Sequence, residues 1–127
     1  MHKLTRREFV KTTGLAGAAL LAPTARVLGA NDDVRVAIIG VGGKGGQHVQ
    51  EFRKIQGVRV VALCDPDSRV LARRVQAFEK ESEGAKVDGH TDFRRVLERS
   101  DVDAVVIATP NHWHALLSIY ACQAGKD

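Results

Sequence analysis

The sequence of 127 residues is poor in cysteine, proline and aromatic residues, and it has no long hydrophobic run. Its two cysteines are too few for a disulfide framework or for a four-cysteine zinc site. No apolar stretch approaches the roughly 20 residues that a membrane-spanning helix needs. With 44% hydrophobic and 27% charged residues, the composition is that of a globular protein, and the length allows one ordinary domain.

The net charge of +4 does not indicate a nucleic-acid partner, because the excess of basic residues is confined to the start of the chain. Residues 1–30 hold five of the 19 basic side chains and one of the 15 acidic ones. The rest of the chain, with 14 side chains of each sign, is neutral. A neutral domain offers no phosphate-tracking surface by charge alone, so we expect no nucleic-acid partner.

Residues 1–30 have the layout of an export signal. The segment Thr5–Lys11 (TRREFVK) is charged and is followed by small apolar residues over 14–22. Its paired arginines resemble a twin-arginine signal, so we expect export by the twin-arginine machinery to the periplasm or another extracytoplasmic location. Leu28 stands where a small residue is preferred before a cut after Ala30, so an uncleaved leader that anchors the protein to a membrane is a second possibility. The structural alternative is an amphipathic helix with a chance pair of arginines.

From residue 34 onward, short β-branched runs alternate with stretches of helical periodicity. This alternation predicts right-handed crossovers and a parallel sheet. We therefore expect residues 31–127 to form a Rossmann-type, doubly wound α/β domain with strand order 3-2-1-4, truncated after the fourth strand–helix unit. The expected strands are 34–39, 58–64, 85–87 and 103–108. The expected helices are 47–56, 68–83, a short one with Phe93, Val96 and Leu97 capped by Thr91, and a last one with Pro110 in its first turn that runs to about residue 124.

A glycine-rich loop, GVGGKGG, joins the first expected strand to the first expected helix. Gly40, Gly42 and Gly45 occupy the three positions of the G-x-G-x-x-G pattern, and Gly43 lies between the last two. Such glycines allow a tight turn, close approach of a pyrophosphate and close helix–strand packing. The N–H groups at the start of the helix then point at the phosphates. Because a strand precedes the loop and a helix follows it, the loop predicts dinucleotide binding rather than a flexible turn.

Asp65 ends the second expected strand, 20 residues after Gly45. A carboxylate there can accept both hydroxyls of an adenosine ribose and would repel a 2′-phosphate, so we expect NAD as the cofactor. Arg69 is close enough in sequence to accommodate a phosphate, which keeps NADP as the less favoured choice. The structural alternative for Asp65 is a turn or cap before Pro66. A methyltransferase also uses a glycine-rich loop followed by an acid, so these two features leave that reaction class open.

The segment Ala108–His114 (ATPNHWH) follows the fourth expected strand, at the carboxyl end of the sheet, where ligands of such domains bind. Together with AIIGVGGKGGQH, ALCDPD and the terminal AGKD, it resembles the Gfo/Idh/MocA family of glucose–fructose oxidoreductase and inositol 2-dehydrogenase. The resemblance covers residues 34–127, and Thr-Pro-Asn-x-x-His is its most specific element. It implies an NAD(P)-dependent oxidoreductase acting on a sugar, polyol or related small molecule. The glycines would bind pyrophosphate and Asp65 the adenosine ribose; the residues implied on the nicotinamide side are Thr109, Pro110, Asn111 and His114.

The sequence given ends at Asp127, before several elements that the family shares. The family continues with a fifth strand, a Glu-Lys-Pro element with the catalytic lysine, and a second domain that forms the substrate pocket. We therefore assign no catalytic residue, and we expect a cofactor-binding half whose sugar or polyol substrate binds only in a full-length protein. The alternatives are an NAD-dependent, redox-neutral glycosidase of the same family and a non-catalytic nucleotide-binding fragment. Because the fourth strand would form an open edge of the sheet, an oligomer is plausible.

His112, His114 and Cys122 invite a metal hypothesis. Side chains two residues apart on a helix diverge by about 200°, so the two imidazoles would not converge, and we expect no metal site. We expect Cys64 and Cys122 to be small buried hydrophobic residues. Trp113 could stack on a ring, although packing against the next helix is the more common role.

Overall fold

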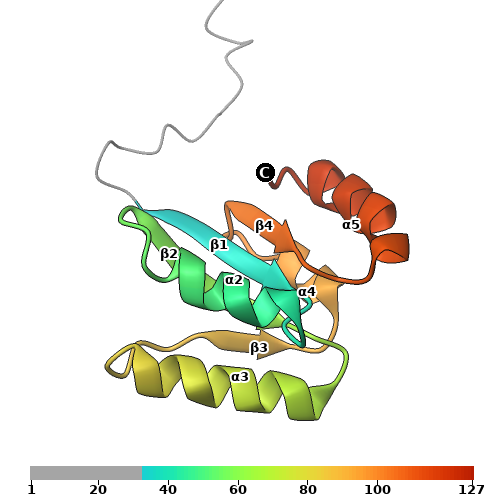
Figure 1. The fold of residues 1–127 in the computed structure, drawn as a ribbon. Helices are drawn as coiled ribbons and strands as arrows, with labels where there is room; N and C mark the ends of the chain where they lie inside the picture. The colour runs from blue at the N-terminus through green and yellow to red at the C-terminus, as the bar shows by residue number, and fades with distance from the viewer. Residues whose placement is uncertain (1–32) are drawn as a thin grey trace, which may run out of the picture. The chain divides into compact units, whose positions relative to one another are not determined.

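The computed structural model describes residues 33–127 as a four-stranded parallel sheet with helices on both faces (Figure 1). The strand order is β3-β2-β1-β4, which confirms the predicted Rossmann-type fold. The export signal predicted for residues 1–30 lies outside the described residues, and no helix within 33–127 is long and apolar enough to cross a membrane. The elements are β1 (Val34–Ile39), α2 (Lys44–Phe52), β2 (Val58–Cys64), α3 (Ser68–Glu81), β3 (Asp88–His90), α4 (Phe93–Leu97), β4 (Ala104–Ile107) and α5 (Asn111–Gln123).

The core has two layers, one on each face of the sheet. Successive residues of a strand point to opposite faces, and both faces of a parallel sheet are covered, so the central strands are apolar throughout. In β1, Val36 and Ile38 pack toward α2 and α3, whereas Ala37 and Ile39 pack toward α4 and α5. Figure 1 shows α2 and α3 on one side of the sheet and α4 and α5 on the other. Because the buried strands are parallel, the loops that follow them lie together at the carboxyl end of the sheet.

The third strand differs from its prediction. It was expected over 85–87, but pairing with β2 begins at Asp88, opposite Ala62, and ends at His90. Val87 is buried in the core just before the strand. Gly89 lies under the side chains of Leu71 and Val75, where a Cβ would come within 3.2 Å of Val75. The middle residue of β3 must therefore be small, and with Asp88 and His90 beside it the strand carries no apolar pattern.

The helix boundaries also differ from their predictions. Helix α2 begins at Lys44 rather than residue 47, so the glycine loop runs directly into its first turn. Asp92, and not Thr91, caps α4, because its side chain accepts a hydrogen bond from the N–H of Arg94. The cap of α3 is Asp67, which accepts hydrogen bonds from two backbone N–H groups of the first turn.

Strand β4 lies at the edge of the sheet, and its four residues are half-buried. The outer side of this strand is paired with one residue that follows α5. The N–H of Val105 donates to the carbonyl oxygen of Asp127 (2.8 Å), and the N–H of Asp127 donates to that of Asp103 (3.1 Å). Part of the edge that was expected to be open is therefore covered by Asp127.

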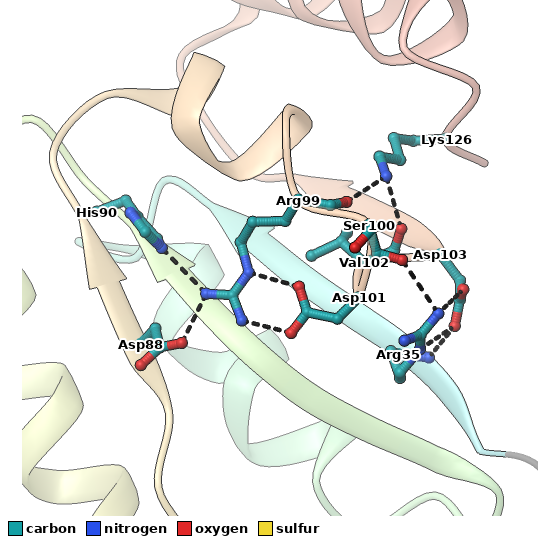
Figure 2. Close-up of polar contacts among 9 residues, drawn as sticks. All are labelled: Arg35, Asp88, His90, Arg99, Ser100, Asp101, Val102, Asp103 and Lys126. Atoms are coloured by element: carbon teal, nitrogen blue, oxygen red, sulfur yellow. Dashed lines mark hydrogen bonds and ion pairs between the residues drawn. The ribbon is translucent and has the colours of Figure 1, made fainter.

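An ion-pair network fastens β3 to the segment between α4 and β4 (Figure 2). The Arg99 guanidinium forms two hydrogen bonds with Asp101, of 2.8 and 2.6 Å, and a third with Asp88 of 2.7 Å. Its Nη1 also lies 3.1 Å from Nε2 of His90. Because a guanidinium only donates, Nε2 of His90 is the acceptor. Charged side chains thus tie both ends of β3, Asp88 and His90, to Arg99.

The hydrogen bonds from Arg99 hold the pKa of Asp101 below its ordinary value of 3.8. A carboxylate with a lowered pKa stabilises the fold above the pKa of the unfolded chain, and this stabilisation is lost as the pH falls through the folded value. We therefore expect stability to fall below about pH 4, with roughly 0.5–1 kcal/mol of the loss due to this partly exposed pair. Urea unfolding at pH 7 and pH 3 measures the loss in the wild type and in Asp101→Asn.

The Asp101→Asn variant should lose less stability between the two pH values than the wild type. Glu98→Gln is the matched control, because within residues 33–127 the Glu98 carboxylate pairs only with exposed Arg95. An Asp101→Asn variant with the pH dependence of the wild type would show that the ion pair contributes nothing to acid stability.

Candidate functional site: a cavity at the carboxyl ends of the strands

A cavity of about 490 Å³ lies beyond the carboxyl ends of β1, β2 and β4. Its walls come from the glycine loop, from the end of β2, from the start of α4 and from the segment between β4 and α5. This is the place where open α/β sheets bind their ligands. The lining residues are Ile39, Gly40, Gly42, Gly43, Cys64, Asp65, Pro66, Thr91, Phe93, Ala108, Thr109, Pro110, Trp113 and Leu117.

Two glycines of the loop occupy positions that admit no side chain. Gly40 has a φ of +88°, and a Cβ there would lie 2.9 Å from backbone atoms of Ala108 and Thr109. A Cβ at Gly45 would overlap the carbonyl oxygen of Gly40. By contrast, a Cβ at Gly43 would meet nothing within 4 Å. Gly40 and Gly45 thus let the loop, α2 and the end of β4 approach one another, and the loop surface at Gly43 stays bare.

Asp65 is buried at the edge of this cavity, with 9% of its surface exposed. One carboxylate oxygen accepts the N–H of Val41 and the other accepts the N–H of Asp67, each at 3.0 Å. Asp65 therefore does have the turn-forming role weighed as an alternative, and it also fixes the glycine loop. Each carboxylate oxygen can accept a second hydrogen bond, so capacity for ribose hydroxyls is retained.

The segment after β4 contributes Thr109 and Pro110 to the cavity. The Thr109 hydroxyl is buried and has no hydrogen-bond partner among residues 33–127. Nε2 of His114 lies 2.7 Å from the carbonyl oxygen of Thr109, so the imidazole fastens this turn. Asn111 begins α5, and neither Asn111 nor His114 lines the cavity.

Arg69 also lies away from the cavity. It lines a separate hollow with Asp67, Ala72 and Arg73 at the start of α3. Among the predicted site residues, the structure thus brings Gly40, Gly42, Gly43, Asp65, Thr109 and Pro110 to the cavity wall. Gly45 acts from behind the loop.

Several lining residues were not predicted as site residues. Phe93 and Thr91 follow the short polar strand β3, whose position the sequence did not reveal. Trp113 lines the cavity with 42% of its surface exposed. Cys64 lines it as a neutral thiol, since burial, and then the charges of Asp65 and Asp92, raise its pKa to about 12. A thiol with such a pKa is not a nucleophile near neutral pH.

The expectation that both cysteines are buried is half wrong. Cys64 is buried, but Cys122 is exposed on α5. Helix α5 is apolar around much of its circumference, so its sequence does not indicate which side faces the sheet. Within residues 33–127 no group of three or more histidine, cysteine or acidic side chains is placed to hold a metal ion.

The wall of the cavity fits a dinucleotide. The amide N–H groups of Gly42 and Gly43 have no partner among the described residues, and the loop presents no side chain there. Backbone N–H groups of this kind bind phosphate oxygens. The same cavity is lined by a buried acceptor, Asp65, and by Thr109, whose hydroxyl is unpaired among the described residues.

Residues 34–127 match the family model GFO_IDH_MocA, described as an oxidoreductase family with an NAD-binding Rossmann fold. The chain belongs to the Gfo/Idh/MocA family. Its described part is the NAD-binding Rossmann domain of that family.

The relatives of this Gfo/Idh/MocA domain include sugar-processing and polyol-oxidising proteins. The chain is 34% identical to an alpha-N-acetylgalactosaminidase of Shewanella oneidensis in an alignment of length 152. The alignment covers 99% of this chain and 33% of the relative. A myo-inositol 2-dehydrogenase of Lactobacillus plantarum superposes with a TM-score of 0.63 and 32% identity, over 76% of this chain and 27% of that one. A scyllo-inositol dehydrogenase of Lactobacillus casei, with NAD(H) and scyllo-inositol bound, superposes with a TM-score of 0.64 and 25% identity, over 75% of this chain and 26% of that one. The chain spans about a third of the length of its curated relatives.

Proposed function

We propose that this domain is the cofactor-binding part of an NAD-dependent enzyme that acts on a sugar, polyol or related small molecule. The observation that carries the proposal is one cavity lined by the bare glycine loop, by buried Asp65 and by Thr109, whose hydroxyl has no hydrogen-bond partner among residues 33–127. When bound, NAD supplies a hydride acceptor, and the domain binds and orients it.

Each part of the wall has a proposed role. The loop glycines Gly40, Gly42, Gly43 and Gly45 leave room for the pyrophosphate and present N–H groups to it. Asp65 accepts the hydroxyls of the adenosine ribose. The nicotinamide half is assigned to the segment after β4, namely Thr109, Pro110, Asn111 and His114. Within it, His114 acts through the Thr109 carbonyl that its ring holds, and no catalytic residue is assigned.

Two reaction types are compatible with this domain. Net oxidation of a polyol is favoured by the likeness to two inositol dehydrogenases. A redox-neutral glycosidase reaction is favoured by the alpha-N-acetylgalactosaminidase relative. The gene product in which this chain occurs should be assayed with inositols and with an N-acetyl-α-galactosaminide. A dehydrogenase accumulates reduced nicotinamide in step with product, whereas a glycosidase releases the aglycone and accumulates none. Absence of both activities in an NAD-loaded sample would contradict the proposed substrate class.

The proposal includes a preference for NAD over NADP. The buried carboxylate of Asp65 would lie close to a 2′-phosphate on the adenosine ribose and would repel it. Arg69, the side chain best suited to neutralise such a phosphate, lines a different hollow.

We also propose that the protein is exported by the twin-arginine route, on the basis of the segment Thr5–Lys11. Two lysine ammonium groups do not reproduce the planar donors of paired guanidinium groups. Arg6→Lys combined with Arg7→Lys should therefore retain the protein in the cytoplasm, as measured by cell fractionation. Arg26→Lys is the control and should leave the distribution unchanged. Export of the double variant at the level of the wild type would refute this route.

A further inference from the structure

Arg74, in the middle of α3, reaches across to the glycine loop. Its Nε donates to the carbonyl oxygen of Val41 (2.9 Å) and its Nη2 to that of Gly42 (3.1 Å). These two carbonyls belong to consecutive peptide groups. No other side chain among the described residues donates to a carbonyl oxygen of the loop, so Arg74 is the side chain that fixes the direction in which the two peptide groups point.

The direction of these carbonyls determines the direction of two amide groups. In a planar trans peptide, the C=O of one residue and the N–H of the next point in opposite directions. A Val41 carbonyl turned toward Arg74 therefore turns the N–H of Gly42 away from it, and the Gly42 carbonyl does the same for the N–H of Gly43. Gly42 and Gly43 line the cavity, whereas Arg74 does not; Arg74 meets these glycines only in two separate hollows, one with Gly42 and one with Gly43.

We propose that Arg74 is a positioning residue for dinucleotide binding, which aims the N–H groups of Gly42 and Gly43 at the pyrophosphate. The inference rests on the proposed placement of the pyrophosphate at the glycine loop. Arg74 acts on the phosphates through the backbone and does not touch them. Without its two hydrogen bonds, the peptide groups are free to rotate, and binding must first select the competent orientation.

Gly46 offers a second way to disturb the same contact. The guanidinium of Arg74 lies over Gly46, and a Cβ at this position would overlap it. Gly46→Ala should therefore displace the guanidinium while leaving every charge in place. Alanine also favours a helix over glycine by about 1 kcal/mol, so a loss of binding in this variant would not reflect a weakened α2.

The test measures binding of NAD and of adenosine, which has no phosphate, by titration calorimetry with the full chain. Arg74→Ala should weaken NAD about tenfold, the loss expected if the competent orientation of the two peptide groups falls to about one tenth of the population. Adenosine binding should be unchanged, since Arg74 does not line the cavity. Arg73→Ala is the matched control, because it removes the same charge from the residue before Arg74. The Arg73 side chain donates to the carbonyl oxygen of Arg69 and not to the loop.

The variants separate positioning from charge. Arg74→Lys keeps the charge but not the two-pronged donor, and it should restore only part of the NAD affinity. Gly46→Ala should weaken NAD on its own, and the double variant Gly46→Ala/Arg74→Ala should bind no more weakly than Arg74→Ala, because both changes break one contact. In nucleotide-free protein, the amide NMR resonances of Gly42 and Gly43 should move in Arg74→Ala and Gly46→Ala but not in Arg73→Ala.

Three results would overturn the inference. They are NAD affinity of Arg74→Ala within about twofold of the wild type, an equal loss of adenosine affinity, or an Arg73→Ala loss as large as that of Arg74→Ala. If the wild type binds adenosine but not NAD, the proposed pyrophosphate site fails instead. The amide resonances then still report whether Arg74 orients the loop.

Discussion

Replacing Gly45 with alanine is expected to abolish measurable NAD binding and to destabilise the domain by about 2–4 kcal/mol. The added Cβ would overlap the carbonyl oxygen of Gly40, a backbone atom that cannot turn away as a flexible side chain would. Gly40 itself is confined, because it packs against the backbone of Ala108 and Thr109. Relief of the overlap therefore requires α2 to move away from β1, and this opens the loop that is proposed to hold the pyrophosphate.

Gly43→Ala is the matched control for the stability measurement, because a Cβ at Gly43 would meet nothing within 4 Å. Its free energy of unfolding should lie within about 0.5 kcal/mol of the wild type. Urea unfolding and NAD titration of both variants check the prediction. A Gly45→Ala protein as stable as the Gly43→Ala protein would show that the close approach of α2 and the loop is not required.

Replacing Asp65 with alanine is expected to weaken NAD by roughly 10- to 100-fold, and NADP by less. The carboxylate is proposed to accept the ribose hydroxyls of NAD, whereas it would repel the 2′-phosphate of NADP. Without the carboxylate, the ribose hydroxyls of NAD lose a hydrogen-bond acceptor, whereas the 2′-phosphate of NADP is no longer repelled. Stability should also fall by about 1–3 kcal/mol, because the N–H groups of Val41 and Asp67 lose their acceptor.

Asp67→Asn is the control for loss of a carboxylate close to Asp65 in the chain. Asp67 caps α3 through the N–H groups of Arg69 and Val70, and it does not line the cavity. This variant should leave the ratio of NAD to NADP affinity unchanged. Titration of both dinucleotides into the three proteins decides the matter. Equal losses of NAD and NADP in Asp65→Ala would leave Asp65 with its turn-forming role alone.

The sequence predicted the parts of the fold that depend on strong local patterns. Strands β1 and β2 have the predicted bounds, because unbroken β-branched runs are typical of strands buried on both faces. Strand β3 could not be located in this way, since Asp88, Gly89 and His90 carry no apolar pattern and are held by the charge of Arg99. The cap of α4 was predicted at Thr91 and lies at Asp92, and residue type could not have corrected this, because both types accept hydrogen bonds from a first helical turn.

The sequence predicted those residues of the candidate site that belong to a motif of recognisable residue types and spacing. The glycine loop and Asp65 are recognisable by type and spacing, and in the structure they line one cavity. Arg74 carries no such signal, because an arginine on a helix is ordinarily a solvated side chain. Its contact with Gly42 joins residues 32 positions apart and depends on how α3 packs beside the loop. Only the folded arrangement gives this arginine its proposed role.

The central claim is that the cavity at the carboxyl ends of β1, β2 and β4 is the dinucleotide site. Titration of the ¹⁵N-labelled chain with NAD, followed by amide NMR, tests this claim most directly. The account predicts that the largest shifts fall on Gly42, Gly43, Asp65 and Thr109, while the amides of Arg99 and Asp101 stay in place. Largest shifts in the Arg99 network, or none in a folded sample, would contradict it.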